Sequence, residues 1–174
     1  MLMGCVAPDE EPVERRDTMP EARVLAEQVW ERWDPSELSF DWQQTVLAWG
    51  MQRGHAASGS SRFSDFYTSW LDAALVERFD QEGAQPFRSS DSMSPASVAA
   101  LALGEDAGAG YGPILDAAEA YLGGARYTSE GAVQHWGPEH PLGGPLQVWV
   151  DSLFMVGMYL VAQYERTGDG AWLE

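Results

Sequence analysis

The chain has 174 residues, of which 45% are hydrophobic and 11% aromatic, and this is enough apolar material for the core of one domain. Its 27 acidic and 10 basic residues leave a formal net charge of -17, which excludes nucleic-acid binding and attachment to anionic lipid through basic residues, because each phosphate contact needs a cation. The count of 1 cysteine excludes an internal disulfide and a CxxC metal or redox site, and we expect neither a metal nor another cofactor.

The chain opens on a short segment, residues 2–5, with the sequence Leu-Met-Gly-Cys. This segment resembles a bacterial lipobox, in which the cysteine is acylated after cleavage just before it. The following residues are acidic and contain prolines, so residues 1–17 are expected to form a flexible tether rather than part of a core. The hypothesis is an extracytoplasmic, membrane-anchored lipoprotein modified at Cys5, in the periplasm or at the cell surface. The alternative is an incidental thiol in an irregular terminus.

Helical periodicity recurs along the rest of the chain, and start signals such as the capping-box spacing at 18–21 precede several stretches. The predicted helices cover residues 18–33, 34–54, 63–75, 94–103, 111–122 and 147–164. The last contains the longest apolar run of the chain, residues 153–162, which is too short to cross a bilayer. No strand pattern competes with these helices. The sequence therefore predicts an all-α domain over residues 18–174, with about three consecutive helix pairs.

Residues 124–145 form the longest stretch without helical periodicity, and they contain glycines, prolines, two histidines and a tryptophan. An irregular segment of this length inside a compact domain usually carries function. Asp151 follows it, at the head of the most apolar helix. The structural interpretation is a helix N-terminal residue, stabilised by the dipole. The functional interpretation is a carboxyl group at a pocket floor, with a pKa that apolar neighbours raise until it can act as a general acid.

The residues around Asp151 carry a resemblance to a known family. Residues 140–155 resemble the signature of the unsaturated glucuronyl and rhamnogalacturonyl hydrolases, glycoside hydrolase families 88 and 105: a histidine, a spacer ending in Tyr-Pro, then Gln-Met-Trp-hydrophobic-Asp-Gly-Leu-Phe-Met. The matching positions are His140, Pro145, Gln147, Trp149, Asp151, Leu153, Phe154 and Met155. The chain departs from the signature at Gly144, Val148 and Ser152. Upstream, residues 40–50 and 90–95 resemble the family more loosely.

The resemblance implies a fold and a size. These families are (α/α)6 toroids, in which six helical hairpins surround a central pocket. About three hairpins fit into residues 18–174, so we expect a partial toroid, the N-terminal half of such a domain. The apolar last helix would then have an uncovered flank, which monomers rarely tolerate. The expectation is a fragment of a protein about twice as long, or a chain that needs a partner half.

The resemblance also implies a reaction. The families act on oligosaccharides ending in a uronic acid with a C4–C5 double bond, and they hydrate that bond. By resemblance, Asp151 protonates C4 and then acts as base toward the water that adds at C5. Asp91, in the element similar to the family's Asp-Asp-Ile-Asn-Pro, would be the second carboxylate and assist or position. A nearby like charge would also raise the pKa of its partner.

Several residues are expected to contact the sugar. The resemblance implies that His140 contacts the substrate and that Trp149 supports the pocket wall or packs on the sugar, while Trp42 and Trp136 are candidate stacking platforms. His135, in the same loop, is a further candidate for substrate binding, although its spacing from Asp151 differs from that of the family. For tryptophans at helical spacing the competing interpretation is an ordinary core position. Because a uronate is anionic and the chain is acidic, binding also needs a local arginine, histidine or helix N-terminus.

Two other functions stay open. One is a non-catalytic helical scaffold, a half-toroid that binds glycan or protein, in which Asp91 and Asp151 lie far apart or solvated with no pocket between them. The other is a related hydrolase that cleaves saturated glycans with two carboxylates flanking the glycosidic bond. Loss of the ultraviolet absorbance of the double bond distinguishes hydration from ordinary hydrolysis.

Overall fold

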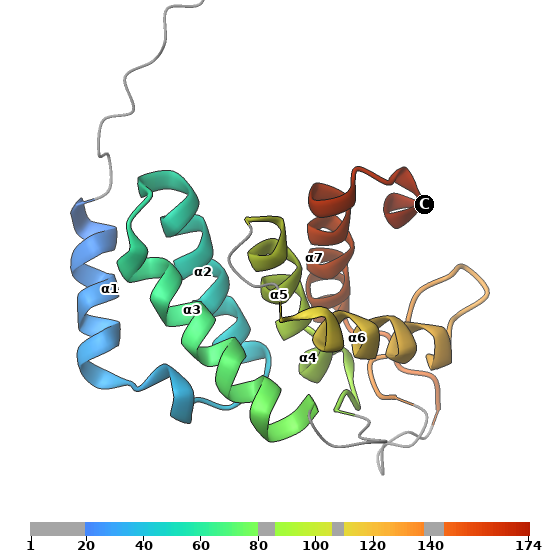
Figure 1. Cartoon of the computed structure of the whole chain (residues 1–174). Helices are drawn as coiled ribbons and strands as arrows, with labels where there is room; N and C mark the ends of the chain where they lie inside the picture. Colours follow the sequence, from blue (N-terminus) through green and yellow to red (C-terminus); the bar gives the residue numbers. More distant parts are fainter. Residues whose placement is uncertain (1–19, 80–85, 106–109, 138–144) are drawn as a thin grey trace, which may run out of the picture.

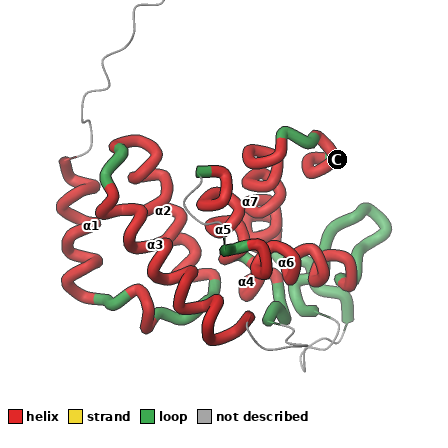
Figure 2. Tube along the Cα trace, viewed as in Figure 1, coloured by secondary structure: helices red, strands yellow, loops and turns green. Residues whose placement is uncertain are grey.

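The computed structural model describes residues 20–79, 86–105, 110–137 and 145–174 (Figure 1). Every named element in this part of the chain is helical, and the pairing outside helices consists of isolated bridges (Figure 2). The all-α prediction is therefore confirmed. The predicted tether at residues 1–17, Cys5 and His140 lie outside the described residues.

The main helices are α1 (Pro20–Arg32), α2 (Trp42–Ser58), α3 (Ser61–Ala74), α5 (Pro95–Gly104), α6 (Gly112–Gly124) and α7 (Val150–Thr167). Shorter elements are η1 (Pro35–Glu37), η2 (Leu75–Phe79), α4 (Ser90–Met93) and η3 (Gly170–Leu173). Each main helix corresponds to one predicted from periodicity. The short helix α4, which leads directly into α5, was not predicted.

Two predicted helix starts differ from the structure. Asp34 caps only the short turn η1, and α2 begins eight residues later, where the Asp41 side chain accepts a hydrogen bond from the Trp42 N–H. The last helix begins at Val150 rather than at Gln147, because the Gln147 carbonyl oxygen accepts a hydrogen bond from the backbone N–H of His135. Long-range pairing thus keeps this segment extended.

Three helices form an inner row. Helix α5 packs against α2 on one side and against α7 on the other, while α3 and α6 lie outside the row (Figure 1). Residues 95–102 of α5 are accordingly all buried. The hydrophobic core continues into α3, with Tyr67, Trp70 and Leu71. Taken in chain order, α1 with α2, α3 with α5 and α6 with α7 make three pairs of an outer and an inner helix.

Helix α7 ends the inner row, and only one of its sides is covered by described residues. Met155, Tyr159 and Ala162 are buried, whereas Leu153 is 75% exposed. Val150, Phe154, Val161 and Tyr164 are exposed as well. No described residue covers this side of α7, which agrees with the expectation for the part of the chain that the structure describes. In the described part of the chain no helix is long and apolar enough to span a membrane.

Candidate active site

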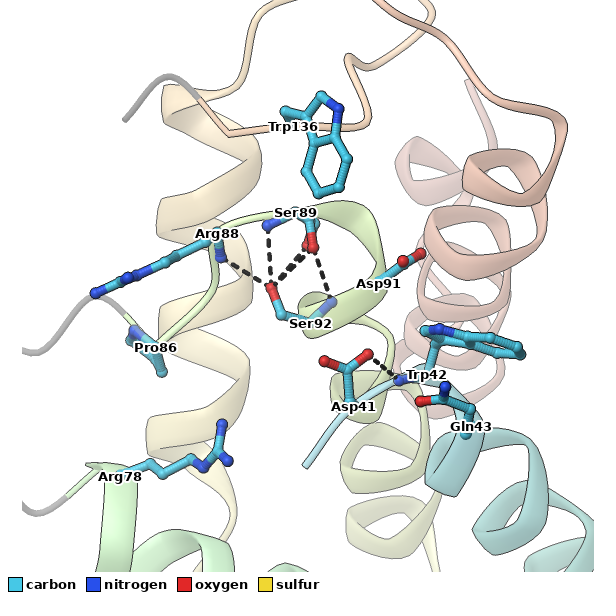
Figure 3. A pocket seen from close by; sticks show the side chains of 10 residues that line it. All are labelled: Asp41, Trp42, Gln43, Arg78, Pro86, Arg88, Ser89, Asp91, Ser92 and Trp136. Carbon is cyan, nitrogen blue, oxygen red and sulfur yellow. Dashed lines mark hydrogen bonds between the residues drawn. The ribbon is translucent and has the colours of Figure 1, made fainter. Parts of the chain in front are cut away.

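A pocket of about 760 Å³ opens at the N-terminal ends of α2 and α4 (Figure 3). This volume lies within the range of small-molecule sites. The lining residues are Asp41, Trp42, Gln43, Arg78, Pro86, Arg88, Ser89, Asp91, Ser92 and Trp136. They come from segments that are far apart in the sequence. The bridge between Ser89 and Trp136 holds the loop segment that contains Trp136 next to the start of α4.

Aspartates stand at the N-terminal ends of neighbouring inner elements. Asp41 caps α2, with its Oδ1 accepting from the Trp42 N–H at 2.6 Å. Asp91 lies in the first turn of α4 and Asp151 in the first turn of α7. A helix N-terminus favours negative charge, so each position stabilises a carboxylate locally. Because α4 packs on both α2 and α7, the packing also brings these acids to one end of the inner row.

Asp91 has a partly buried carboxyl group at the wall of the pocket. Its side chain is 21% exposed, and in the described structure its buried Oδ1 has no hydrogen-bond partner. Burial raises the pKa of Asp91, the nearby His135 lowers it, and the charges of Asp151 and Asp41 raise it further, with a net upward shift. A carboxyl group that keeps its proton more readily than usual, at the wall of a pocket, suits general acid catalysis.

Asp151 differs from the expectation of apolar burial. Its side chain is exposed, and the pocket described above does not include it among its lining residues. The apolar neighbours Val150, Leu153 and Phe154 are themselves exposed, so they remove little water from its carboxyl group. The charge of Asp151 nevertheless raises the pKa of Asp91, which places the two acids within electrostatic reach of each other.

The aromatic residues divide into two groups. Trp42, at the start of α2, and Trp136, in the segment between α6 and α7, both line the pocket (Figure 3). Trp149 lies instead on the imidazole of His135, with ring centroids 4.0 Å apart and planes 7° apart. His135 is fully buried and so stands behind Asp91 rather than on the pocket surface.

The structure adds pocket residues that we did not predict from the sequence. Arg78 and Arg88 bring positive charge to a pocket that also contains Asp41 and Asp91, and Gln43 adds an amide. The sequence contained only weak signals for these pocket residues. Arg88 lies three residues before Asp91, and Asp41 precedes Trp42 in the stretch that resembles the family. Among the described residues, no cluster of histidine, cysteine and acidic side chains could hold a metal ion.

The close approach of the loop to the segment before α4 depends on Gly137. Its N–H donates to the Arg88 carbonyl oxygen at 2.7 Å, and a Cβ atom there would lie 2.9 Å from the same oxygen.

We expect Gly137→Ala to lower the free energy of unfolding by about 1–3 kcal/mol, as overpacking does, and to weaken ligand binding in the pocket. Gly123→Ala is the control, because a Cβ atom there meets nothing within 4 Å. Denaturant unfolding of both variants tests this, and equal stabilities would contradict it.

Residues 13–174 match the family model described as Glycosyl Hydrolase Family 88. The match spans both the Asp91 and the Asp151 segments. No curated protein and no solved structure matches the chain.

Proposed function

Because the chain belongs to Glycosyl Hydrolase Family 88, we propose that it hydrates the C4–C5 double bond of oligosaccharides that end in an unsaturated uronic acid. Its general class, an all-α glycoside hydrolase with the fold of a partial toroid, follows from the family and the helical structure. The observation that supports the finer proposal is the carboxyl group of Asp91, which lies at the pocket wall with a pKa that burial raises and that the charge of Asp151 raises further.

In the proposed reaction, Asp151 transfers a proton to C4, and positive charge develops at C5 and the ring oxygen. Asp151 has this role because it occupies the acid position of the family signature, whereas the raised pKa belongs to Asp91. A water molecule adds at C5 and gives its proton to the Asp151 carboxylate, which restores the acid form of Asp151. The product is a hemiketal that opens to a ketone and releases the rest of the saccharide as an alcohol. Asp91 is the second carboxyl group, which assists from the pocket wall. One proton enters and one leaves, so no cofactor is needed for the balance.

The pocket lining supports an anionic sugar as the ligand. Arg78 and Arg88 line the pocket, and a guanidinium group can bind a carboxylate with two parallel hydrogen bonds. Trp42 and Trp136 offer aromatic rings on which the C–H faces of a pyranose can pack. In a chain with a net charge of -17, these arginines reduce the repulsion that a uronate would otherwise meet.

The proposal predicts the effect of Asp151→Asn. Asparagine cannot donate the proton, so kcat should fall by about 10²–10⁴-fold, the usual contribution of a general acid. Because Asp151 is exposed, the thermal unfolding midpoint should change little. The assay follows the loss of ultraviolet absorbance of an unsaturated disaccharide. Asp65→Asn, another exposed aspartate on a helix, is the control and should keep full activity.

The same assay separates the competing functions. Shortening of saturated glycans without consumption of the double bond would support a hydrolase with two carboxylates at the glycosidic bond. Binding of glycan by a folded chain with no turnover of either substrate would support a scaffold. Full activity of Asp151→Asn would overturn the assignment of Asp151 as proton donor.

We also propose what covers the exposed face of α7. Val150, Leu153 and Phe154 belong to a larger apolar surface of the kind that marks an interface. Further hairpins of a ring, supplied by a longer chain or a partner half, would bury it. Adding such a half should lower the binding of a hydrophobic dye to the chain. Unchanged dye binding would contradict the proposal.

For the location we propose a lipoprotein anchored through Cys5, outside the cytoplasm. Support comes from the lipobox-like sequence of residues 2–5. Mass spectrometry of the protein from its native membrane would show a diacylglycerol adduct on the cysteine. Recovery of an unmodified thiol would contradict it.

A further inference from the structure

His135 is held by its backbone from both sides. Its N–H donates to the Gln147 carbonyl oxygen at 2.8 Å, and its carbonyl oxygen accepts from the Ser90 N–H at 2.9 Å. The residue therefore joins the long loop to the start of α4 and to the segment that enters α7. Such a position fixes where the imidazole lies relative to the acids at these helix ends.

The imidazole ring is also fixed in orientation. Its Nδ1 lies 2.9 Å from the Ser90 hydroxyl and 3.2 Å from the Ser152 hydroxyl, and the two hydroxyls are 3.0 Å apart. Trp149 stacks on one face, and the Trp136 ring approaches edge-on at 4.3 Å. Rotation of the ring would break these contacts, so they fix the direction in which the second ring nitrogen, Nε2, points.

That second nitrogen points to Asp91. Nε2 of His135 is buried and has no hydrogen-bond partner among the described residues, and it lies 3.8 Å from Oδ2 of Asp91. A serine hydroxyl can donate to Nδ1, which leaves the proton of a neutral ring on Nε2, facing the carboxyl group. The distance is too long for a direct hydrogen bond. Catalytic contacts are often long in the absence of substrate and tighten in the complex.

We propose that His135 is a positioning residue for Asp91: its buried Nε2–H, oriented by Ser90 and Ser152, holds the carboxyl group of Asp91 toward the pocket. His135 touches no substrate in this arrangement and acts through Asp91. The contribution to catalysis rests on the proposed function, whereas the contact itself does not.

The charges around Asp91 give the sign of the effect. Burial and the charges of Asp151 and Asp41 oppose its ionisation, and His135 favours it. When the ring is neutral, an Nε2–H that faces the carboxyl group acts in the same direction through its dipole. Tyr121 is a further titratable group within electrostatic reach of Asp91. Removing the Nε2–H while the other groups stay should therefore raise the pKa of Asp91 further.

The first test needs no variant. ¹⁵N NMR of the histidines in the intact protein reports which ring nitrogen carries the proton. The proposal expects the Nε2–H form at His135 at neutral pH. A ring protonated on Nδ1 alone would overturn it, and this reading stands even where a substituted protein does not fold.

The second test compares two substitutions with ¹³C NMR titration of the aspartate carboxyl groups. In His135→Asn the amide reaches the position of Nδ1 only, so the pKa of Asp91 should rise. In His135→Gln an amide N–H can reach the position of Nε2, so the pKa should return toward that of the parent. His55→Asn is the control, because Nδ1 of His55 lies near the Ser60 carbonyl oxygen at the end of α2. An unchanged titration of Asp91 in folded His135→Asn would overturn the proposal.

Kinetics then separate positioning from a structural role. His135→Asn should lower kcat by about 10²-fold, the size of effect expected from misplacing a catalytic group, with KM little changed and with recovery in His135→Gln. Equal losses in both variants, with an unshifted pH profile, would mean that His135 only supports the fold. If the parent protein hydrates no unsaturated substrate, the proposed function fails while both NMR readings still test the contact.

Discussion

Replacing Asp91 by asparagine is expected to lower kcat by about 10²–10⁴-fold while the protein stays folded and becomes no less stable at neutral pH. The carboxyl group of Asp91 lies at the pocket wall, with one buried oxygen unpartnered in the described structure and the charges of Asp41 and Asp151 nearby. An ionised group in this place is unfavourable for folding. Asparagine removes the charge. This removes the contribution of Asp91 to the reaction and also the unfavourable free energy of placing an ionised group there.

The sign of the pH dependence follows from the raised pKa of Asp91. The folded state binds the proton more tightly than the unfolded chain does, in which an aspartate has its ordinary pKa of 3.8. This group therefore favours the folded state fully below that value, and the contribution is lost as the pH rises through the raised folded pKa. The stability advantage of Asp91→Asn should accordingly appear above this window and vanish below it.

Denaturant unfolding of the parent and of Asp91→Asn at several pH values measures this difference, with the disaccharide assay run on the same samples. Asp65→Asn again serves as the control, since its side chain is exposed on α3. A loss of stability in Asp91→Asn that is the same at every pH would show that the carboxyl group supports the fold rather than the reaction.

Trp70→Ala should produce the largest loss of stability among the tryptophans. Its side chain is 1% exposed, its ring lies 4.9 Å from that of Phe40, and its Nε1–H donates to the Ser39 carbonyl oxygen at 3.2 Å. Truncation leaves a large cavity and should lower the free energy of unfolding by about 3–5 kcal/mol. For a chain of this size, the thermal midpoint falls by about 2–4 °C per kcal/mol.

Trp33→Ala is the matched control, because that side chain is 45% exposed and should cost far less. The Trp70 contacts also hold residues 39–40, which lead into Asp41 at the pocket. We therefore expect Trp70→Ala to weaken substrate binding at temperatures where the variant is still folded. Similar midpoints for the two variants, measured by circular dichroism, would contradict the assignment of Trp70 to the core.

The positions of the helices were predictable because their signals are local. Apolar spacing predicted each main helix, and the glycine after the last one, Gly168, ends α7 with a φ of 70°. The residue types that cap helices could be recognised in the sequence, but the residue at which a long helix begins could not always be predicted. Asp34 and Asp41 are both good caps, and only the second begins a long helix, because packing selects between local signals of similar strength.

The burial of individual acids was not predictable from the sequence. Asp151 stands among apolar residues in the chain, yet it is exposed, because burial depends on which neighbouring helix covers that side of α7. Asp91 was a candidate through the resemblance of its segment to the family, but nothing in its neighbouring residues indicated the burial that raises its pKa.

The residue types and helix spacings along the chain are enough to establish the all-α class, the family resemblance and the candidate acids, since each is written in neighbouring residues. The pocket, the arginines that line it and the placement of His135 behind Asp91 arise from contacts between segments that are distant in the sequence, such as the Ser90–His135 hydrogen bond. Such contacts exist only once the helices have packed, because the free energy that holds them comes from burying surfaces that no single segment possesses.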